Sequence, residues 1–142
     1  MPTAERTVGI RRPVEEVFAF VAEGRTAPRW RTGVLDIDRV SGEGLGAVYR
    51  QGVRGPGGLR IDADYEITAF EANRHIGFRT IAGPVRPEGD FRFEAMGDAT
   101  IVTFTLRAPL SGWKRLLMSG PVRSSMDAEM GALDELRDLL ER

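Results

Sequence analysis

Cysteine is absent from the 142-residue sequence, and histidine occurs only once, at His75. Without cysteine the chain can form no disulfide, no thiolate metal site and no cysteine nucleophile. A single histidine excludes any site that needs two imidazole groups. Serines are present, but none lies in the Gly-x-Ser-x-Gly motif that exposes a nucleophilic serine. The sequence therefore predicts no metal site and no cofactor, and it leaves any catalytic residue unknown.

The sequence also lacks a long apolar run and has almost no net charge. Its apolar stretches fall short of the ~20 residues that a membrane-spanning helix requires, and residues 1–6 lack the apolar core of a signal peptide. The formal net charge is −1 and the arginines are dispersed along the chain, which argues against a basic surface for nucleic acid. We therefore expect a cytoplasmic protein, monomeric or homodimeric, without an integral membrane segment or a nucleic-acid partner.

What is present indicates a single α+β domain spanning residues 1–142, with no linker or internal repeat. Two short helices, around Pro13–Gly24 and Pro28–Trp30, are expected between the first and second strands. The short connections between later segments favour antiparallel strand pairs. Apolar and polar residues alternate as in β-strands in seven segments, which cover residues 3–12, 34–40, 47–54, 59–70, 75–81, about 91–94, and 100–107.

A long amphipathic helix is predicted after the last strand. From Pro121 onward, apolar residues recur every three or four positions, which is the period of one helix face, at Val122, Met126, Met130, Leu133, Leu136 and Leu140. Because no other large apolar surface remains to be covered, this helix must lie on the sheet. Methionine side chains adapt to irregular neighbours, so this helix face suits a binding surface as well as a core.

Several polar patterns are better explained by turns and solvated faces than by sites. The glycines at 42, 44 and 46 join one pair of strands and those at 55, 57 and 58 join another, whereas a phosphate-binding loop leads into a helix. His75 begins a strand and is expected at a rim or on the surface. The strand 59–70 has an apolar face formed by residues 61, 63, 65 and 67, so we expect the alternating acids to face water: Asp62, Asp64 and Glu66.

Most aromatic residues fall on the inward faces of the predicted strands. Each ring removes about 150–250 Å² from water on burial, so simple filling of the core is one explanation. Small residues on the same faces, at Ala63, Ala69 and Ala95, favour instead a hollow beneath a single spanning helix about 30 Å long. We therefore predict a ligand-sized cavity. Its predicted ligand-binding residues are Trp30, Tyr49, Gln51, Tyr65, Phe78, Phe91, Phe93, Phe104, Met126 and Met130.

Five short segments follow one another in a familiar order along nearly the whole chain. They are Arg12–Phe18, Pro28–Trp30, Gly44–Ala47, Tyr65–Phe70 with the following Arg74–Ile76, and Ala99–Thr103. In this order they resemble the START-like (SRPBCC) superfamily, and they look most similar to its polyketide cyclase/dehydrase-like branch. The chain departs from the pattern at Glu23–Arg25, where the superfamily usually has an acidic or amide residue, and this predicts a different pocket mouth.

The resemblance implies the helix-grip fold. In this α+β fold a seven-stranded antiparallel sheet curves around the long C-terminal helix, with two short helices between strands 1 and 2. It also implies a pocket for a hydrophobic small molecule, and functions such as lipid transport. It carries over no catalytic residue, because the superfamily has no universal one.

Three functions remain open at this point. The protein could carry or sequester a hydrophobic, ring-containing molecule such as a lipid or a polyketide. It could instead be a polyketide cyclase or dehydratase that relies on positioning and one acid/base group. Candidates for that group are Tyr49, Tyr65, Gln51 and an inward arginine, Arg50 or Arg79. A third possibility is a module that binds a protein partner.

Overall fold

The computed structural model describes residues 3–83, 85–109 and 112–142, and for residues 56, 112–122 and 125 it describes the backbone alone. The described elements are, in chain order, β1 (Thr3–Ile10), α1 (Val14–Ala22), the 3₁₀ helix η1 (Gly24–Arg29), β2 (Val34–Ser41), β3 (Val48–Arg54), the 3₁₀ helix η2 (Pro56–Gly58), β4 (Arg60–Asp62), β5 (Tyr65–Glu71), β6 (His75–Thr80), β7 (Glu88–Met96), β8 (Ala99–Arg107) and α2 (Gly112–Glu141).

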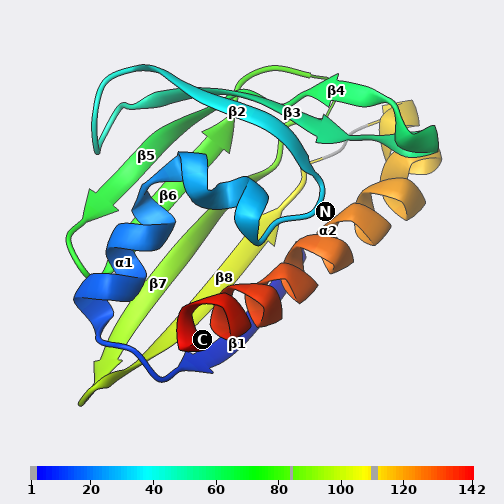
Figure 1. Ribbon diagram of the computed structural model, residues 1–142. Coiled ribbons are helices and arrows are strands. Elements are labelled where there is room, and N and C mark those ends of the chain that lie inside the picture. Colours follow the sequence, from blue (N-terminus) through cyan, green and yellow to red (C-terminus); the bar gives the residue numbers. More distant parts are fainter. Residues whose placement is uncertain (1–2, 84, 110–111) are drawn as a thin grey trace.

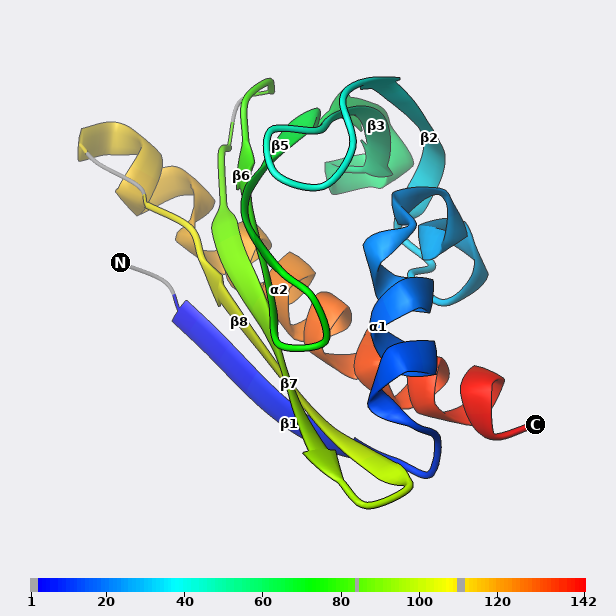
Figure 2. The same ribbon diagram turned by 90° about the vertical axis from the view of Figure 1, so that its left-hand side faces the viewer.

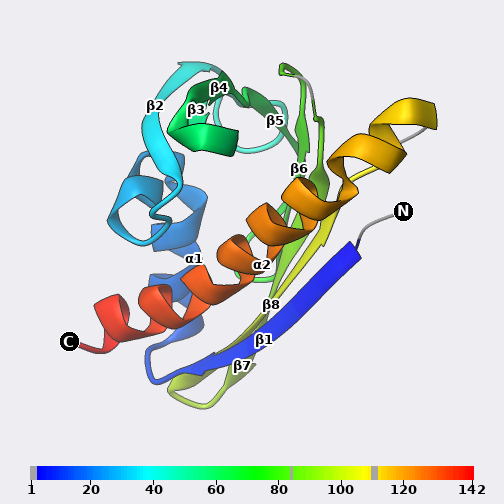
Figure 3. The same cartoon turned by 90° about the vertical axis from the view of Figure 1, so that its right-hand side faces the viewer.

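The strands form one antiparallel sheet that bends around α2. Its order is β1-β8-β7-β6-β5-β3-β2, and the short strand β4 pairs with β3. β2 and β3 arch over the side of the sheet on which α1 and α2 lie (Figure 1, Figure 2). α2 runs alongside β1 across this concave side (Figure 3). The predicted helix-grip architecture is therefore confirmed, including the two short helices between the first two strands.

The sheet has eight strands rather than the predicted seven, because the predicted strand 59–70 is interrupted. β4 and β5 both pair with β3, in one common register. Between them, the Asp64 carboxylate accepts a hydrogen bond from the Gln51 N–H at 3.1 Å. The Asp64 carbonyl accepts one from the Ile81 N–H at 2.7 Å, so the backbone here turns toward the end of β6. This also corrects the expectation that the Asp64 side chain faces water.

A second irregularity reverses the direction of side chains within β5. The pairing of β5 with β6 shifts by one residue between Ile67 and Ala69, as in a β-bulge. Beyond the shift Phe70 points to the concave side, where its ring meets the edge of Phe18 at 5.3 Å between centroids. Ala69 lies on the outer face near Asp90, so the expectation that it leaves inner space is wrong. Ala95 is exposed rather than part of the inner wall.

The hydrophobic core lies between the sheet and the two α-helices. α1 contributes its buried face, formed by Val14, Val17 and Phe18. Four residues of the predicted apolar face of α2 are at most 6% exposed, namely Met126, Met130, Leu133 and Leu136. Leu140 is half-buried, and the side chain of Val122 lies outside the described residues. Burial of each large apolar side chain contributes about 1.5–3 kcal/mol, so this face fixes α2 on the sheet.

Polar contacts also join the C-terminal half of α2 to the N-terminal strand. Arg6 on β1 pairs with Asp134, and Arg11, just after β1, pairs with Glu141. The two pairs join residues 128 and 130 positions apart in the sequence. No helix in the described part of the chain is long and apolar enough to cross a membrane.

Candidate functional site

A cavity of about 540 Å³ lies between the concave side of the sheet, η1 and α2. Phe93 does not line it. Its ring contacts Phe18 of α1 at 5.2 Å between centroids. Met130, one turn beyond Met126 on α2, is buried in the core beside it. Because the cavity exists, a core that is completely filled is excluded. The other eight predicted residues line the cavity, namely Trp30, Tyr49, Gln51, Tyr65, Phe78, Phe91, Phe104 and Met126.

Stacked aromatic rings form one wall of the cavity. Tyr49 on β3 lies opposite Tyr65 on β5, and their rings stack with centroids 5.0 Å apart. Phe91 on β7 lies opposite Phe104 on β8, and their rings stack 4.3 Å apart. Phe78 on β6 bridges the two pairs, at 5.9 Å from Tyr65 and 6.2 Å from Phe91. The cross-strand register thus places these rings side by side in a continuous apolar surface.

Two glycines make room for these rings. A Cβ atom at Gly89 would lie 3.0 Å from the Phe78 ring and 2.5 Å from a backbone carbonyl oxygen of β8. A Cβ atom at Gly24 would lie 2.6 Å from the Tyr49 ring and 2.7 Å from the Tyr65 hydroxyl oxygen. Gly24 therefore allows η1 to approach both tyrosines, and its N–H donates to the Tyr49 hydroxyl at 3.4 Å. The segment that departs from the superfamily pattern thus brings its backbone onto the cavity wall.

A charged pair lies within this mostly apolar wall. Arg31, just after η1, donates from Nε and Nη2 to the two carboxylate oxygens of Glu129 on α2, at 2.7 and 2.9 Å. Its Nη1 atom donates to Oε1 of Gln51 at 3.2 Å. The Gln51 amide donates in turn to the Ala63 carbonyl oxygen at 3.2 Å. These bonds connect α2 to β3 and to the chain after η1 across the cavity.

Burial and neighbouring charges together influence the protonation of Arg31 and Tyr65. Burial opposes the charge of Arg31, but the charge of Glu129 and the hydrogen bonds to it outweigh this effect and raise the pKa of Arg31. Burial also raises the pKa of Tyr65, because a phenolate would be poorly solvated there. At neutral pH the wall therefore contains a paired cation and a neutral, protonated tyrosine.

Sequence reasoning does not identify Arg31 or Glu129 as part of the site. A signal for Glu129 is nevertheless present, because it lies three residues after Met126 and four before Leu133, on the apolar face of the helix. An acid at such a position requires a partner, since an unpaired buried charge is costly. Nothing in the sequence indicates that the partner is Arg31, which is 98 residues away along the chain.

The two arginines considered from the sequence as acid/base candidates lie outside the cavity. The expectation that Arg50 or Arg79 points inward is wrong. Arg50 pairs with Asp38 and Arg79 with Glu66, and the two arginine side chains are 65% and 57% exposed. Within the described ranges, no three histidine or acidic side chains come together in a group that could hold a metal ion.

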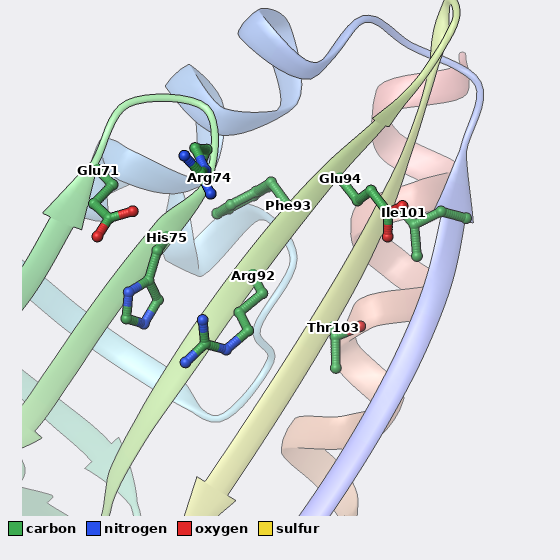
Figure 4. A pocket seen from close by; sticks show the side chains of 8 residues that line it. All are labelled: Glu71, Arg74, His75, Arg92, Phe93, Glu94, Ile101 and Thr103. Carbon is green, nitrogen blue, oxygen red and sulfur yellow. The ribbon is translucent and has the colours of Figure 1, made fainter.

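His75 begins β6 on the outer face of the sheet, beside a second hollow of about 320 Å³ (Figure 4). Its Nε2 atom lies 2.6 Å from Oδ1 of Asp90, and Arg107 donates to Oδ2 of Asp90 at 3.0 Å. Burial opposes the charge of Asp90, but the hydrogen bonds from His75 and Arg107 outweigh it and lower the pKa of Asp90. The sheet separates this group from the aromatic cavity.

Comparisons with known proteins agree with this architecture. Residues 1–140 match the family described as polyketide cyclase/dehydrase and lipid transport. No curated protein matches the chain. The structure of TTHA0849 from Thermus thermophilus superposes with a TM-score of 0.82 at 20% identity, covering 98% of this chain and 97% of that one.

Two further solved structures have the same fold. A START superfamily protein from Mycobacterium smegmatis superposes with a TM-score of 0.75 at 15% identity, covering 97% of this chain and 98% of that one. The aromatase/cyclase Zhui from Streptomyces superposes with a TM-score of 0.74 at 15% identity, covering 99% and 94%. At these identities the likeness concerns the fold.

Proposed function

The chain belongs to the polyketide cyclase/dehydrase and lipid transport family, and from this premise we propose that it binds a hydrophobic, ring-containing small molecule as a carrier or sequestering protein. The observation that carries the proposal is the cavity of about 540 Å³ with its wall of aromatic rings. Ligand pockets commonly measure about 300–1,000 Å³ and combine apolar walls with a few polar groups.

The chemistry of the wall supports a ligand that contains rings. Flat aromatic side chains give a large contact area, and they favour a guest that can stack or meet them edge-on. Met126 adds a flexible side chain that can adapt to the outline of a guest. A guest that packs against these rings would gain dispersion contacts with the wall atoms.

A binding screen with a matched pair of variants tests this proposal. Native mass spectrometry and thermal shift are applied to a panel of lipids, polycyclic hydrocarbons and polyketide-like phenols. A ligand at one hundred times its Kd should stabilise the protein by about 2.7 kcal/mol. Ala63→Leu narrows the cavity and should weaken binding at least tenfold, whereas Ala95→Leu makes the same change at an exposed site and should not. A panel without a binder, or equal effects of the two variants, would count against the proposal.

A second candidate function is that of a cyclase or dehydratase. The observation in its favour is that ionisable groups lie in the cavity wall, namely Tyr65 and the Arg31–Glu129 pair. Burial raises the pKa of Tyr65 above its already high ordinary value, so its hydroxyl keeps its proton and can donate a hydrogen bond to a substrate carbonyl. The remaining rate acceleration would come from holding a flexible, reactive substrate chain in the folded shape that cyclisation requires.

Turnover of a linear poly-β-ketone distinguishes this candidate from simple carriage. If the second function is correct, the protein should accelerate formation of the aromatic product above the rate in buffer. Tyr65→Phe should then lower the rate at least tenfold with little change in substrate affinity, because only the hydroxyl is removed. If the wild-type rate equals the buffer rate while the compound binds, the cyclase function is excluded and the carrier function stands.

A further inference from the structure

The indole N–H of Trp30 is an exception in an otherwise well-paired interior. Trp30 is 4% exposed and lines the cavity. Its Nε1 atom is buried without a hydrogen-bond partner among the described residues, and no other buried side-chain nitrogen or oxygen in those ranges lacks one. Proteins leave few buried polar groups unpaired, so each one calls for a specific explanation.

The described surroundings of Trp30 explain why the protein itself does not satisfy this donor. The indole meets the edge of Phe91, with centroids 6.2 Å apart and an angle of 73° between the rings, and Phe91 stacks on Phe104. These rings carry no acceptor oxygen. Because the indole nitrogen can only donate, its partner must be an acceptor. A water molecule in that position would itself need two to four polar neighbours, which the phenylalanines do not offer.

The charged pair in the same wall limits the kind of acceptor that can enter. The guanidinium of Arg31 already donates to both carboxylate oxygens of Glu129 and to Gln51. An anionic group placed beside this pair would meet the charge of Glu129 without a free cation to balance it. The other arginine in the wall, Arg54, is exposed. An anionic acceptor is therefore disfavoured beside this pair, and the acceptor that suits the buried indole N–H is an uncharged one.

We propose that the ligand carries an uncharged acceptor oxygen on its buried part, such as a ketone, ester or ether oxygen, and that Trp30 donates its indole N–H to that oxygen. This inference rests on the proposed ligand-binding function and narrows it. The cavity prefers oxygenated ring compounds to hydrocarbons of the same shape, and Trp30 is the residue that makes the distinction. Satisfying the buried donor corresponds to about five- to fiftyfold tighter binding.

Pairs of compounds that differ in one group test this preference. The first pair is 9-fluorenone and fluorene, and the second is benzophenone and diphenylmethane; in each pair a carbonyl group replaces a methylene group in one ring skeleton. Equilibrium dialysis measures the affinities. In ¹⁵N-labelled protein the two indole N–H signals are assigned with Trp113→Phe, since the chain has two tryptophans. Each ketone should bind at least fivefold more tightly than its hydrocarbon and should shift the Trp30 indole proton downfield, whereas the hydrocarbon should not.

Trp30→Phe removes the N–H and keeps an aromatic ring. In this variant the ratio of ketone to hydrocarbon affinity should fall to about one in each pair, whatever change the smaller ring makes to both affinities. If the variant does not fold, the indole shift in the wild-type protein decides. Equal affinities within each pair, with an unmoved Trp30 signal, would overturn the inference and leave the proposed function intact. If no compound of the wider panel binds, both are overturned.

Discussion

Arg31 and Glu129 show how single residues combine to make the cavity wall. Each charge would be costly in this mostly apolar setting if it were alone. Their bidentate contact and the link to Gln51 satisfy both groups, and the side chains are only 19% and 21% exposed. Such pairs contribute little net stability compared with apolar substitutes, but breaking one by removing a partner is strongly destabilising.

Glu129→Gln leaves the guanidinium of Arg31 without its counter-charge. We expect the free energy of unfolding to fall by about 2–4 kcal/mol, which is slightly less than for a fully buried pair because both groups retain some contact with solvent. Urea denaturation at neutral pH measures the loss. Glu66→Gln is the matched control, because it breaks the exposed pair with Arg79 and should cost less than about 1 kcal/mol. Equal losses in the two variants would contradict the buried role of Arg31.

The lowered pKa of Asp90 leads to a prediction of how the free energy of unfolding changes in acid. Although burial opposes its charge, the hydrogen bonds from His75 and Arg107 hold the pKa of Asp90 below its unfolded value. The resulting stabilisation is complete above the unfolded pKa of about 3.9, and it is lost as the pH falls through the lower native pKa. The free energy of unfolding of wild type should therefore decrease more steeply below about pH 4 than that of Asp90→Asn.

The exposed turn variant Asp98→Asn provides the control for this pH series. It should follow the wild-type curve, whereas Asp90→Asn should start lower at pH 7 and converge with wild type in acid. Urea midpoints between pH 7 and pH 2 measure all three curves. Parallel curves for wild type and Asp90→Asn would show that this network does not contribute to the pH dependence.

At the scale of strands, the pairing register places the aromatic rings of the cavity wall side by side, and Gly89 allows the Phe78 ring to lie close to its neighbouring strands. Gly89→Ala should destabilise the protein by about 1–3 kcal/mol, because the added methyl group would meet the Phe78 ring at 3.0 Å and a β8 carbonyl oxygen at 2.5 Å. Gly9→Ala on β1 is the matched control. Its added methyl group would lie 3.9 Å from Ile101, so stability should stay unchanged or rise by up to about 1 kcal/mol. Thermal unfolding compares the two variants, and a neutral Gly89→Ala would refute the close approach.

The strands and the aromatic side of the sheet can be predicted from the sequence, because alternation with a period of two directly reports which side chains share a face. The inward direction of Tyr65 and Ile67 follows from it. Alternation does not reveal the β-bulge before Ala69. One extra residue exchanges the faces of all the residues that follow in the strand, which is why Phe70 points to the concave side. It also does not show that the Asp64 side chain substitutes for a backbone acceptor.

Contacts between distant elements are the other part that the sequence does not reveal. Tyr49 and Phe104 are predicted in the wall because each belongs to a strand with a clear period. Arg31 lies just after a short helix without such a period, and its partner lies on a different element. A pairing of this kind depends on how the elements are placed in three dimensions, which no local pattern encodes.

At the scale of the whole molecule, a change that fills the cavity should raise the free energy of unfolding and lower the affinity for a ligand. Ala63→Leu adds apolar atoms that fill part of the cavity and bury against its wall, so the free energy of unfolding should rise by about 1–2 kcal/mol while ligand binding should weaken. Urea denaturation without ligand measures the gain, with Ala95→Leu as the exposed control, for which little change is expected. A loss of more than about 1 kcal/mol in Ala63→Leu would mean that the space cannot accept the larger side chain.

α2 packs beside β1 and supplies Met126 and Glu129 to the cavity, yet it follows every strand in the chain. During synthesis the ribosome therefore makes every strand segment before it makes the helix that completes the cavity wall. Before α2 is made, α1, η1 and the arching strands β2 and β3 are already present, but the side of the cavity formed by Met126 and Glu129 is missing. The cavity can therefore close only after translation has passed the last strand and α2 has packed beside β1 (Figure 3).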